Sequence, residues 1–321
     1  MKYVYVLVSR SNDCYAEQTI VSIYSLRKTN PGCHVLVAAD DDTLKSLTGK
    51  RSRLKDIVDE FVCFDVPVNY SPVQRSRHIK TSLRQEISGD FLFVDADTLI
   101  LGDLSGLAEI GDDFCAARMQ DSYEWSVDNP QGMLKTYYEM RGLKEYSGVR
   151  DYHNSGVMFI KDTPAAHELF RDWHELWTES STQFGYHKDQ PALWIANYRK
   201  GSIIKDLDGK YNLQATAPRI ALRYLGDCRV FHYISTARFL AGFNMKNPEF
   251  LDKMLDSDNS AELDMMLADV KNDYLNGLYI STNLPDWIYS PLVQIARKIS
   301  ERLPAIDKTI IKINNLFHKK Y

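Results

Sequence analysis

The sequence predicts an α/β protein whose central sheet is mostly parallel and is covered by helices on both faces. Three observations support this prediction. Strand and helix signals alternate over the first hundred residues at the spacing of βαβ units. The chain has 321 residues, of which 44% are hydrophobic and 26% charged, which excludes disorder, collagen and coiled coil. The chain also contains no internal repeat and no low-complexity segment.

The first strand is expected at Tyr3–Val8, where six apolar residues precede a polar break. A helix is expected over Tyr15–Arg27, because its apolar residues recur at helical spacing before Pro31 and Gly32 end it. The further elements expected in this half are a strand at 34–39, a helix at about 42–53, a strand at 61–64 and a strand at 91–94.

The second half begins with an insertion, residues 111–152, that is rich in acidic and aromatic side chains and has a helical patch at 133–140. We expect it to shape one side of a cleft. A strand at 157–160 and an amphipathic helix at 167–177 follow, and the tryptophans of this helix are expected in the core. We expect one α/β domain over residues 1–245 and a mostly helical extension over 246–321.

The carboxyl-terminal segment 294–321 carries seven Lys or Arg residues and two acids, whereas the rest of the chain has a net charge of −9. Pro304 stands where a helix could begin, and apolar residues then recur every three or four positions with lysines between them. The pattern predicts a basic amphipathic helix. Such a helix either lies against an anionic membrane or packs its isoleucine stripe on the domain.

Charge and cysteine content narrow the class of protein. The net charge of −4 provides no long-range field for nucleic acid, so no nucleic-acid partner is expected. Five widely spaced cysteines indicate a reducing compartment. The apolar run at the amino terminus is too short for a signal peptide, and no run reaches 18 apolar residues. We expect a cytoplasmic protein that is either free or peripheral on the cytosolic membrane face.

Two carboxylates, Asp95 and Asp97, directly follow the apolar strand 91–94. At the carboxyl end of a buried strand both can face the crevice where open α/β sheets bind ligands, and there they would hold a divalent cation on a diphosphate. An acidic turn is the alternative. Haloacid dehalogenase-type phosphatases also have D-x-D after a strand, but Leu99 occupies the place of their threonine or valine and some ninety residues precede the pair.

Four segments in order, FLFVDADTLILGDL, HNSGVMFI, HKDQPALW and FHYIST, resemble the motif series of the family 8 glycosyltransferases. The resemblance covers roughly residues 3–240. It implies the GT-A fold of nucleotide-sugar transferases, with a Rossmann-like sheet and helices on both faces. It also implies that Asp95, Ala96 and Asp97 contact the metal-bound diphosphate, with His232 as the third metal ligand. Two carboxylates and an imidazole suit Mn²⁺ better than Mg²⁺.

The resemblance also implies which residues bind the nucleotide part of a UDP-sugar donor. Asp13 and Tyr15 lie just after the first strand, where the family binds the uracil ring. Lys80, or Arg77 in its place, would offset phosphate charge. The family's lysine after the H-Y element is absent, and Arg238 is the candidate to replace it.

The donor sugar would be held by a second group of residues. Asn154 in the N-S-G element would hydrogen-bond the sugar, with Ser155 beside it, and Asp121 would reach its hydroxyl groups. Asp189 and Gln190 match the D-Q element beside the anomeric carbon, so the chemistry is expected at this pair. Asp189 could also cap the helix that follows it.

The implied activity is a metal-dependent, retaining transfer of a hexose, glucose or galactose, from a UDP-sugar to a glycan or lipid-linked saccharide acceptor. A non-catalytic nucleotide-sugar or glycan-binding protein on a degenerate transferase scaffold is the alternative. A nucleotidyltransferase would need a glycine-rich phosphate loop after the first strand, and SRSNDCY has no glycine.

Overall fold

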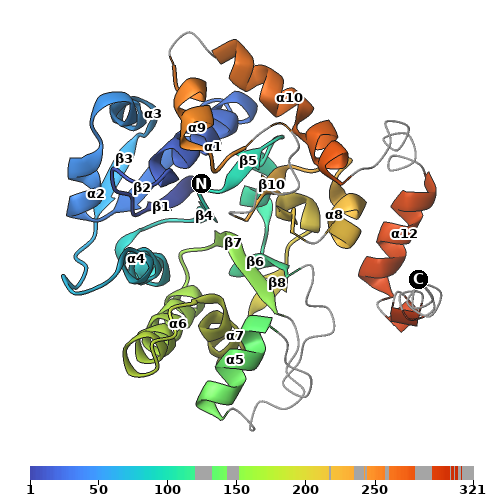
Figure 1. Cartoon of the computed structure of the whole chain (residues 1–321). Coiled ribbons are helices and arrows are strands. Elements are labelled where there is room, and N and C mark those ends of the chain that lie inside the picture. The colour runs from blue at the N-terminus through green and yellow to red at the C-terminus, as the bar shows by residue number, and fades with distance from the viewer. Residues whose placement is uncertain are drawn as a thin grey trace.

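Within the part of the chain that the structure describes, seven strands form one mixed sheet in the order β3-β2-β1-β4-β7-β6-β8 (Figure 1). The structure is a computed structural model that describes residues 1–119, 132–142, 152–216, 218–234, 244–256, 260–278 and 291–303, with single positions 242, 305, 306, 308, 309 and 312. The strands are β1 (Lys2–Leu7), β2 (His34–Ala39), β3 (Glu60–Cys63), β4 (Phe91–Val94), β5 (Thr98–Ile100), β6 (Phe114–Arg118), β7 (His153–Ile160), β8 (Ile204–Asp206), β9 (Leu213–Gln214) and β10 (Val230–His232).

Strands β1 to β4 are mutually parallel, whereas β7 pairs antiparallel with both β4 and β6. The chain leaves β1 toward β2 and β3 and then returns to β4 on the other side of β1. Strand order therefore reverses between β1 and β4. In open α/β sheets, ligands bind at the carboxyl ends of the strands that flank such a reversal.

Helices cover both faces of the sheet, and each face has its own apolar core (Figure 1). Helices α1, α9 and α10 pack on one face, and α4, α6 and α7 on the other. The α-helices are α1 (Tyr15–Thr29), α2 (Asp41–Ser46), α3 (Leu54–Ile57), α4 (Pro72–Glu86), α5 (Gly132–Arg141), α6 (Pro164–Gln183), α7 (Gln190–Arg199), α8 (Pro218–Tyr224), α9 (Pro248–Met254), α10 (Ser260–Gly277) and α12 (Pro291–Arg302), and short 3-10 helices lie at η1 (Gly49–Arg53), η2 (Ser105–Glu109) and η4 (Gly209–Tyr211).

A second, small sheet has the order β5-β10-β9. Strand β5 follows β4 after three residues, and β10 pairs antiparallel with it so that His232 lies opposite Thr98. This pairing carries a histidine from late in the chain to the end of β4. The small sheet therefore completes the ligand-binding edge of the large one.

The predicted elements of the first hundred residues are confirmed, with one difference. The helix expected at about 42–53 is broken into α2 and η1, because Gly49 has a φ of +57° that no α-helix continues through. The strand expected at 157–160 begins earlier, at His153, and Trp173 and Trp177 are fully buried as expected.

The predicted basic helix beyond Pro304 lies mostly outside the described residues. In the described part of the chain, no helix combines the length and the apolar character that a membrane crossing requires.

Candidate active site

Three potential metal ligands converge at the end of β4. Asp95 and Asp97 follow the strand directly, and the antiparallel pairing of β10 with β5 brings His232 opposite them. One ligand atom from each of the three residues lies within 4.8 Å of the other two. The Nε2 atom of His232 is 3.2 Å from the Oδ1 atom of Asp97. The structure thus brings together the three potential metal ligands that the resemblance implies, and their mixed oxygen and nitrogen atoms would fit a divalent cation such as Mn²⁺.

The turn that carries the two carboxylates is fixed by hydrogen bonds to its backbone. The amide of Asp95 donates to the carbonyl of Gly156 at 2.8 Å, and the hydroxyl of Thr98 donates to the carbonyl of Asp95 at 2.8 Å. The amide of Tyr233 donates to the carbonyl of Asp97 at 3.1 Å. Strands β7, β5 and β10 therefore all hold this turn, and the carboxylates need little ordering when they bind a ligand.

Lys80 of α4 is the central cation of the site, and it is only 2% exposed. Its Nζ atom is 3.2 Å from Asp95 Oδ1, 3.2 Å from the hydroxyl of Ser155 and 3.6 Å from Asp189 Oδ2. The ammonium group also lies 4.7 Å from the ring centroid of Phe93. Burial raises the pKa of Asp95 above its ordinary value and outweighs the opposing effect of Lys80.

Asp189 precedes α7 at the cap position, but its side chain makes no capping hydrogen bond. The carboxylate instead faces the cations: its Oδ1 is 2.9 Å from Arg77 Nε, and its Oδ2 accepts from Ser155 at 3.1 Å. Burial would raise the pKa of Asp189, but Lys80 and Arg77 outweigh it and hold that pKa below its ordinary value. The group is therefore a firmly ionised, doubly paired carboxylate.

Gln190 is buried beside this carboxylate at the first turn of α7. Its Oε1 accepts from the backbone amide of Ser155 at 3.3 Å, and its Nε2 lies 3.6 Å from the sulfur of Met119. Asn154, from the same strand as Ser155, also points its amide nitrogen at Met119, at 3.5 Å. The N-S-G and D-Q elements are thus joined by hydrogen bonds. Met119, which no sequence pattern singles out, lies between their amides.

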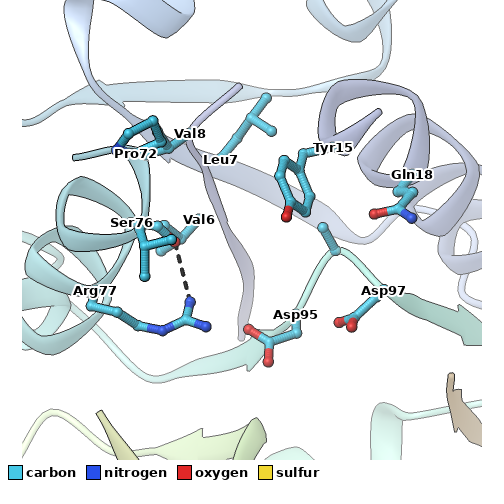
Figure 2. Close-up of a pocket in the computed structure, with 12 residues that line it drawn as sticks. Val6, Leu7, Val8, Tyr15, Gln18, Pro72, Ser76, Arg77, Asp95 and Asp97 are labelled. Atoms are coloured by element: carbon cyan, nitrogen blue, oxygen red, sulfur yellow. Dashed lines mark hydrogen bonds between the residues drawn. The ribbon is translucent and has the colours of Figure 1, made fainter. Parts of the chain in front are cut away.

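A pocket of about 250 Å³ opens above the metal-ligand cluster (Figure 2). Tyr15 lies on one side of it with 49% of its surface exposed, and Arg77 lies on the other. Figure 2 shows the carboxylates of Asp95 and Asp97 side by side below this space. The residues that line the pocket are Val6, Leu7, Val8, Tyr15, Gln18, Pro72, Val73, Ser76, Arg77, Asp95, Ala96 and Asp97.

Asp13 has a structural position that the sequence does not reveal. Its Oδ1 accepts from the hydroxyl of Ser9 at 2.6 Å and from the amide of Tyr15 at 3.2 Å, and its Oδ2 accepts from the amide of Arg10 at 2.7 Å. Arg51 of η1 donates to the carbonyls of Arg10 and Asp13. The carboxylate of Asp13 therefore shapes the loop that presents Tyr15, and it is not among the residues that line the pocket.

Two residues that the resemblance assigns to the site, Asp121 and Arg238, lie outside the described residues. Apart from Asp13, the other assigned residues meet around the pocket and the metal-ligand cluster: Tyr15, Arg77, Lys80, Asp95, Ala96, Asp97, Asn154, Ser155, Asp189, Gln190 and His232. They come from α1, α4, β7, α7 and β10 or from the loops that follow β4 and precede α7. Only the fold brings them to one edge of the sheet.

The fold and the site together define a glycosyltransferase of the GT-A type. The sequence profile of glycosyl transferase family 8 matches residues 6–239, and the chain belongs to this family. No curated protein sequence matches the chain significantly.

Solved structures of glycosyltransferases have the same fold. The galactosyltransferase LgtC in complex with donor and acceptor sugar analogues has a TM-score of 0.52 at 16% identity, over 80% of this chain and 96% of LgtC. GlyE from Streptococcus pneumoniae TIGR4 has a TM-score of 0.51 at 15% identity, and this chain spans 84% of its own length and 64% of GlyE. The bifunctional WbbM has a TM-score of 0.53 at 13% identity, over 83% of this chain and 51% of WbbM.

Proposed function

We propose that the protein is a metal-dependent, retaining glycosyltransferase that moves a hexose, glucose or galactose, from a UDP-sugar to a glycan or lipid-linked saccharide acceptor. The observation that carries the proposal is the convergence of Asp95, Asp97 and His232 within 4.8 Å below a pocket at the carboxyl ends of β1 and β4. Mn²⁺, or Mg²⁺ in its place, would be held by these three side chains. A bound divalent cation supplies positive charge to a diphosphate.

The charges of the site support a role for the cation. The three carboxylates Asp95, Asp97 and Asp189 face two cationic side chains, Lys80 and Arg77. With His232 neutral, these five groups sum to −1, which repels a nucleoside diphosphate. A divalent cation changes the sum to +1, so donor binding is expected to require the metal.

The position of each side chain around the pocket suggests how the donor would lie. Tyr15 offers a ring face to the uracil at the outer side of the pocket. The diphosphate would lie over Asp95 and Asp97, and Arg77 would donate to its oxygens. Asn154 and Gln190, which are buried on β7 and α7, would face the sugar.

In the transfer, the bond from the anomeric carbon to the phosphate oxygen breaks, and its electron pair stays on UDP. The acceptor hydroxyl forms the new bond on the same face of the sugar, and its proton passes to the departing phosphate. Arg77 and Lys80 stabilise the negative charge that develops there. Asp189 is already bound by Lys80, Arg77 and Ser155, so it makes a poor nucleophile, and Gln190 stabilises the positive charge on the sugar. Trapping of a glycosyl adduct on Asp189, Gln190 or Asp121 would contradict same-face attack.

The test is release of UDP from UDP-glucose and UDP-galactose without acceptor, with and without Mn²⁺. We expect metal-dependent release from one donor, reduced at least about 100-fold in Asp97→Ala, because an electrostatic contribution of a few kcal/mol is lost. Asp41→Ala, which removes an exposed carboxylate on α2, is the control and should retain full activity. Metal-dependent binding of UDP without release from any donor would favour the non-catalytic alternative, and no binding of UDP would contradict the proposed UDP-sugar donor.

The acceptor proposal rests partly on α12. Its inward face carries Arg297, whereas Leu292 and Ile295 are 75% and 56% exposed, and Lys298 and Arg302 are exposed beside them. We propose that this apolar and basic surface holds the enzyme on the cytosolic face of an anionic membrane, near a lipid-linked acceptor.

Vesicle co-sedimentation tests the membrane contact. The full-length chain is expected to bind vesicles that contain anionic lipid and to bind neutral vesicles weakly. The double variant Lys298→Glu/Arg302→Glu should bind the anionic vesicles at least about tenfold more weakly, because each basic residue near the surface contributes about 1 kcal/mol. Equal binding of the wild type to both vesicle types would contradict this part of the proposal.

A further inference from the structure

A chain of buried amides connects the histidine of the metal-ligand cluster to the N-S-G element. Asn212 ends η4 directly before β9, and its side chain is fully buried. Its Oδ1 is 2.9 Å from His232 Nδ1, and its Nδ2 donates to Asn154 Oδ1 at 2.9 Å. The backbone amide of Gly156 donates to the same Oδ1 of Asn154 at 2.8 Å. No sequence pattern singles out Asn212.

The direction of each hydrogen bond between these side chains follows from the one backbone group that takes part, the amide of Gly156. The amide of Gly156 is a donor only, so the atom of Asn154 that it contacts must be the carbonyl oxygen. The atom of Asn212 that contacts this same oxygen is then its NH₂ group, which leaves its carbonyl oxygen facing the imidazole. An oxygen without hydrogen can only accept, so His232 Nδ1 must carry a proton.

The result is an imidazole whose other nitrogen is available to a metal. With the proton on Nδ1, the lone pair of the neutral ring is on Nε2, and Nε2 is the atom that faces Asp97 at 3.2 Å. Histidines that bind metals generally donate the second ring N–H to an oxygen that fixes the orientation of the ring. Here the amide oxygen of Asn212 occupies that position.

The space around the ring is equally restricted. A Cβ atom added to Gly156 would lie 2.2 Å from Cε1 and 2.8 Å from Nδ1 of His232. The imidazole therefore packs directly on the backbone of β7, and Gly156 also accepts the hydrogen bond from the amide of Asp95. One glycine thus contacts the imidazole, starts the amide chain and holds the turn of the two carboxylates.

We propose that Asn212 is a positioning residue, which holds His232 in the Nδ1–H form for metal binding and couples this ligand to the sugar-facing Asn154. This inference rests on the proposed function and extends it to a residue that holds a potential metal ligand and is not itself one. Loss of the Asn212 oxygen frees the ring to rotate or to place its proton on Nε2. Either change removes a metal ligand while both carboxylates remain.

The test compares the affinity of the full-length protein for Mn²⁺ alone, measured from the electron paramagnetic resonance signal of the free ion. Asn212→Leu keeps most of the volume and removes the oxygen, so we expect Mn²⁺ affinity to fall about 10- to 100-fold, as for other partners of metal-binding histidines. Asn212→Asp keeps an oxygen opposite Nδ1–H but loses the N–H donor to Asn154, so its Mn²⁺ affinity should fall by less than about tenfold.

The matched control is Asn30, a buried asparagine at the other end of α1, whose Oδ1 accepts from Leu104 and whose Nδ2 donates to Gly102. Asn30→Leu should destabilise the protein in thermal unfolding and leave Mn²⁺ affinity unchanged. Equal Mn²⁺ affinity of Asn212→Leu and Asn212→Asp would overturn the inference, and so would an equal loss in Asn30→Leu. If the wild type bound no Mn²⁺, the proposed metal dependence itself would be wrong.

Discussion

At the scale of single residues, the site depends on charged groups that are shielded from water and neutralise one another's charge. Lys80 is the clearest case, because its ammonium group lies between Asp95 and Asp189 and is almost completely buried. Buried charges of this kind add little net stability as a set, but removal of one member leaves its partners without compensation. A substitution of one of these charged residues therefore destabilises the protein mainly through the partners that it leaves unpaired.

Replacement of Lys80 by methionine should lower the free energy of unfolding by about 3 kcal/mol, because the buried carboxylate of Asp189 and the half-buried carboxylate of Asp95 lose their shared cation. Urea denaturation at pH 7 measures this change. Lys45→Met, which removes an exposed partner of Asp41, is the control and should leave the midpoint unchanged. Equal midpoints for Lys80→Met and the wild type would show that the ammonium group does not compensate these carboxylates.

Gly156→Ala should displace the imidazole of His232, since the new methyl carbon would lie 2.2 Å from its Cε1 atom. We expect at least a tenfold loss of Mn²⁺ affinity and a destabilisation of about 1–3 kcal/mol, as for other overpacked positions. Gly106→Ala is the matched control, because nothing lies within 4 Å of the added carbon. Titration with Mn²⁺ and thermal unfolding provide the two measurements, and an unaltered Mn²⁺ affinity in Gly156→Ala would contradict the close packing.

At the scale of elements, α4 matters because it carries both cations of the site, Arg77 and Lys80. Its outer side packs on α6 through His78 and His174, whose ring centroids are 4.9 Å apart at a steep angle. The Nδ1 atom of His174 is 2.7 Å from the hydroxyl of Thr81. The position of α4, and with it the cations, therefore depends on two imidazoles that must stay neutral.

Burial, with His78 adding to it, lowers the pKa of His174 from 6.5 to about 4. Between these values the unfolded chain binds a proton that the native state does not, so stability falls as the pH drops from 6.5 to 4. The shift corresponds to at most about 3 kcal/mol. His174→Gln should therefore lose less stability than the wild type between pH 7 and pH 5 in urea denaturation. The exposed His34→Gln is the control, and identical slopes for His174→Gln and the wild type would contradict the assignment.

At the scale of the whole molecule, the carboxyl-terminal helices are docked on the α/β unit. Leu251 of α9 and Tyr274 of α10 belong to the same apolar core as α1. Helix α12 is held differently, through the buried guanidinium of Arg297, which contacts Asp208 at 2.6 Å and Asp227 at 2.7 Å and lies over the ring of Tyr224. The division of the chain near residue 245 stays a prediction.

Arg297→Met should release α12, because the substitution removes the ion pairs of α12 with Asp208 and Asp227 and the contact with the ring of Tyr224. Protection of the α12 amides against hydrogen exchange should fall about 10- to 100-fold, which corresponds to roughly 1–3 kcal/mol, whereas protection of β1 and β4 should not change. Arg302→Met, at an exposed position of the same helix, is the control. Unchanged protection in Arg297→Met would mean that α12 is held by other contacts.

The sequence alone predicts the elements of the first hundred residues well, because each is a local pattern: apolar runs form β1, β2 and β4, and helical periodicity forms α1. The same applies to Asp95 and Asp97, which are separated by one residue in the chain and need only the end of a strand to acquire their geometry. The family motifs add His232, Asp189 and Gln190, since their order along the chain is itself a sequence property.

Only the tertiary structure decided the contacts between residues that are distant in the chain. Hydrogen-bond direction and steric fit depend on distances of a few tenths of an ångström, which no spacing in a sequence encodes. The contacts of Asn212 with His232 and Asn154, and those of Met119 with Asn154 and Gln190, therefore become visible only in the folded chain. Asp13, which the sequence places with the base, binds its own loop, because three donors lie close to its carboxylate in the folded chain.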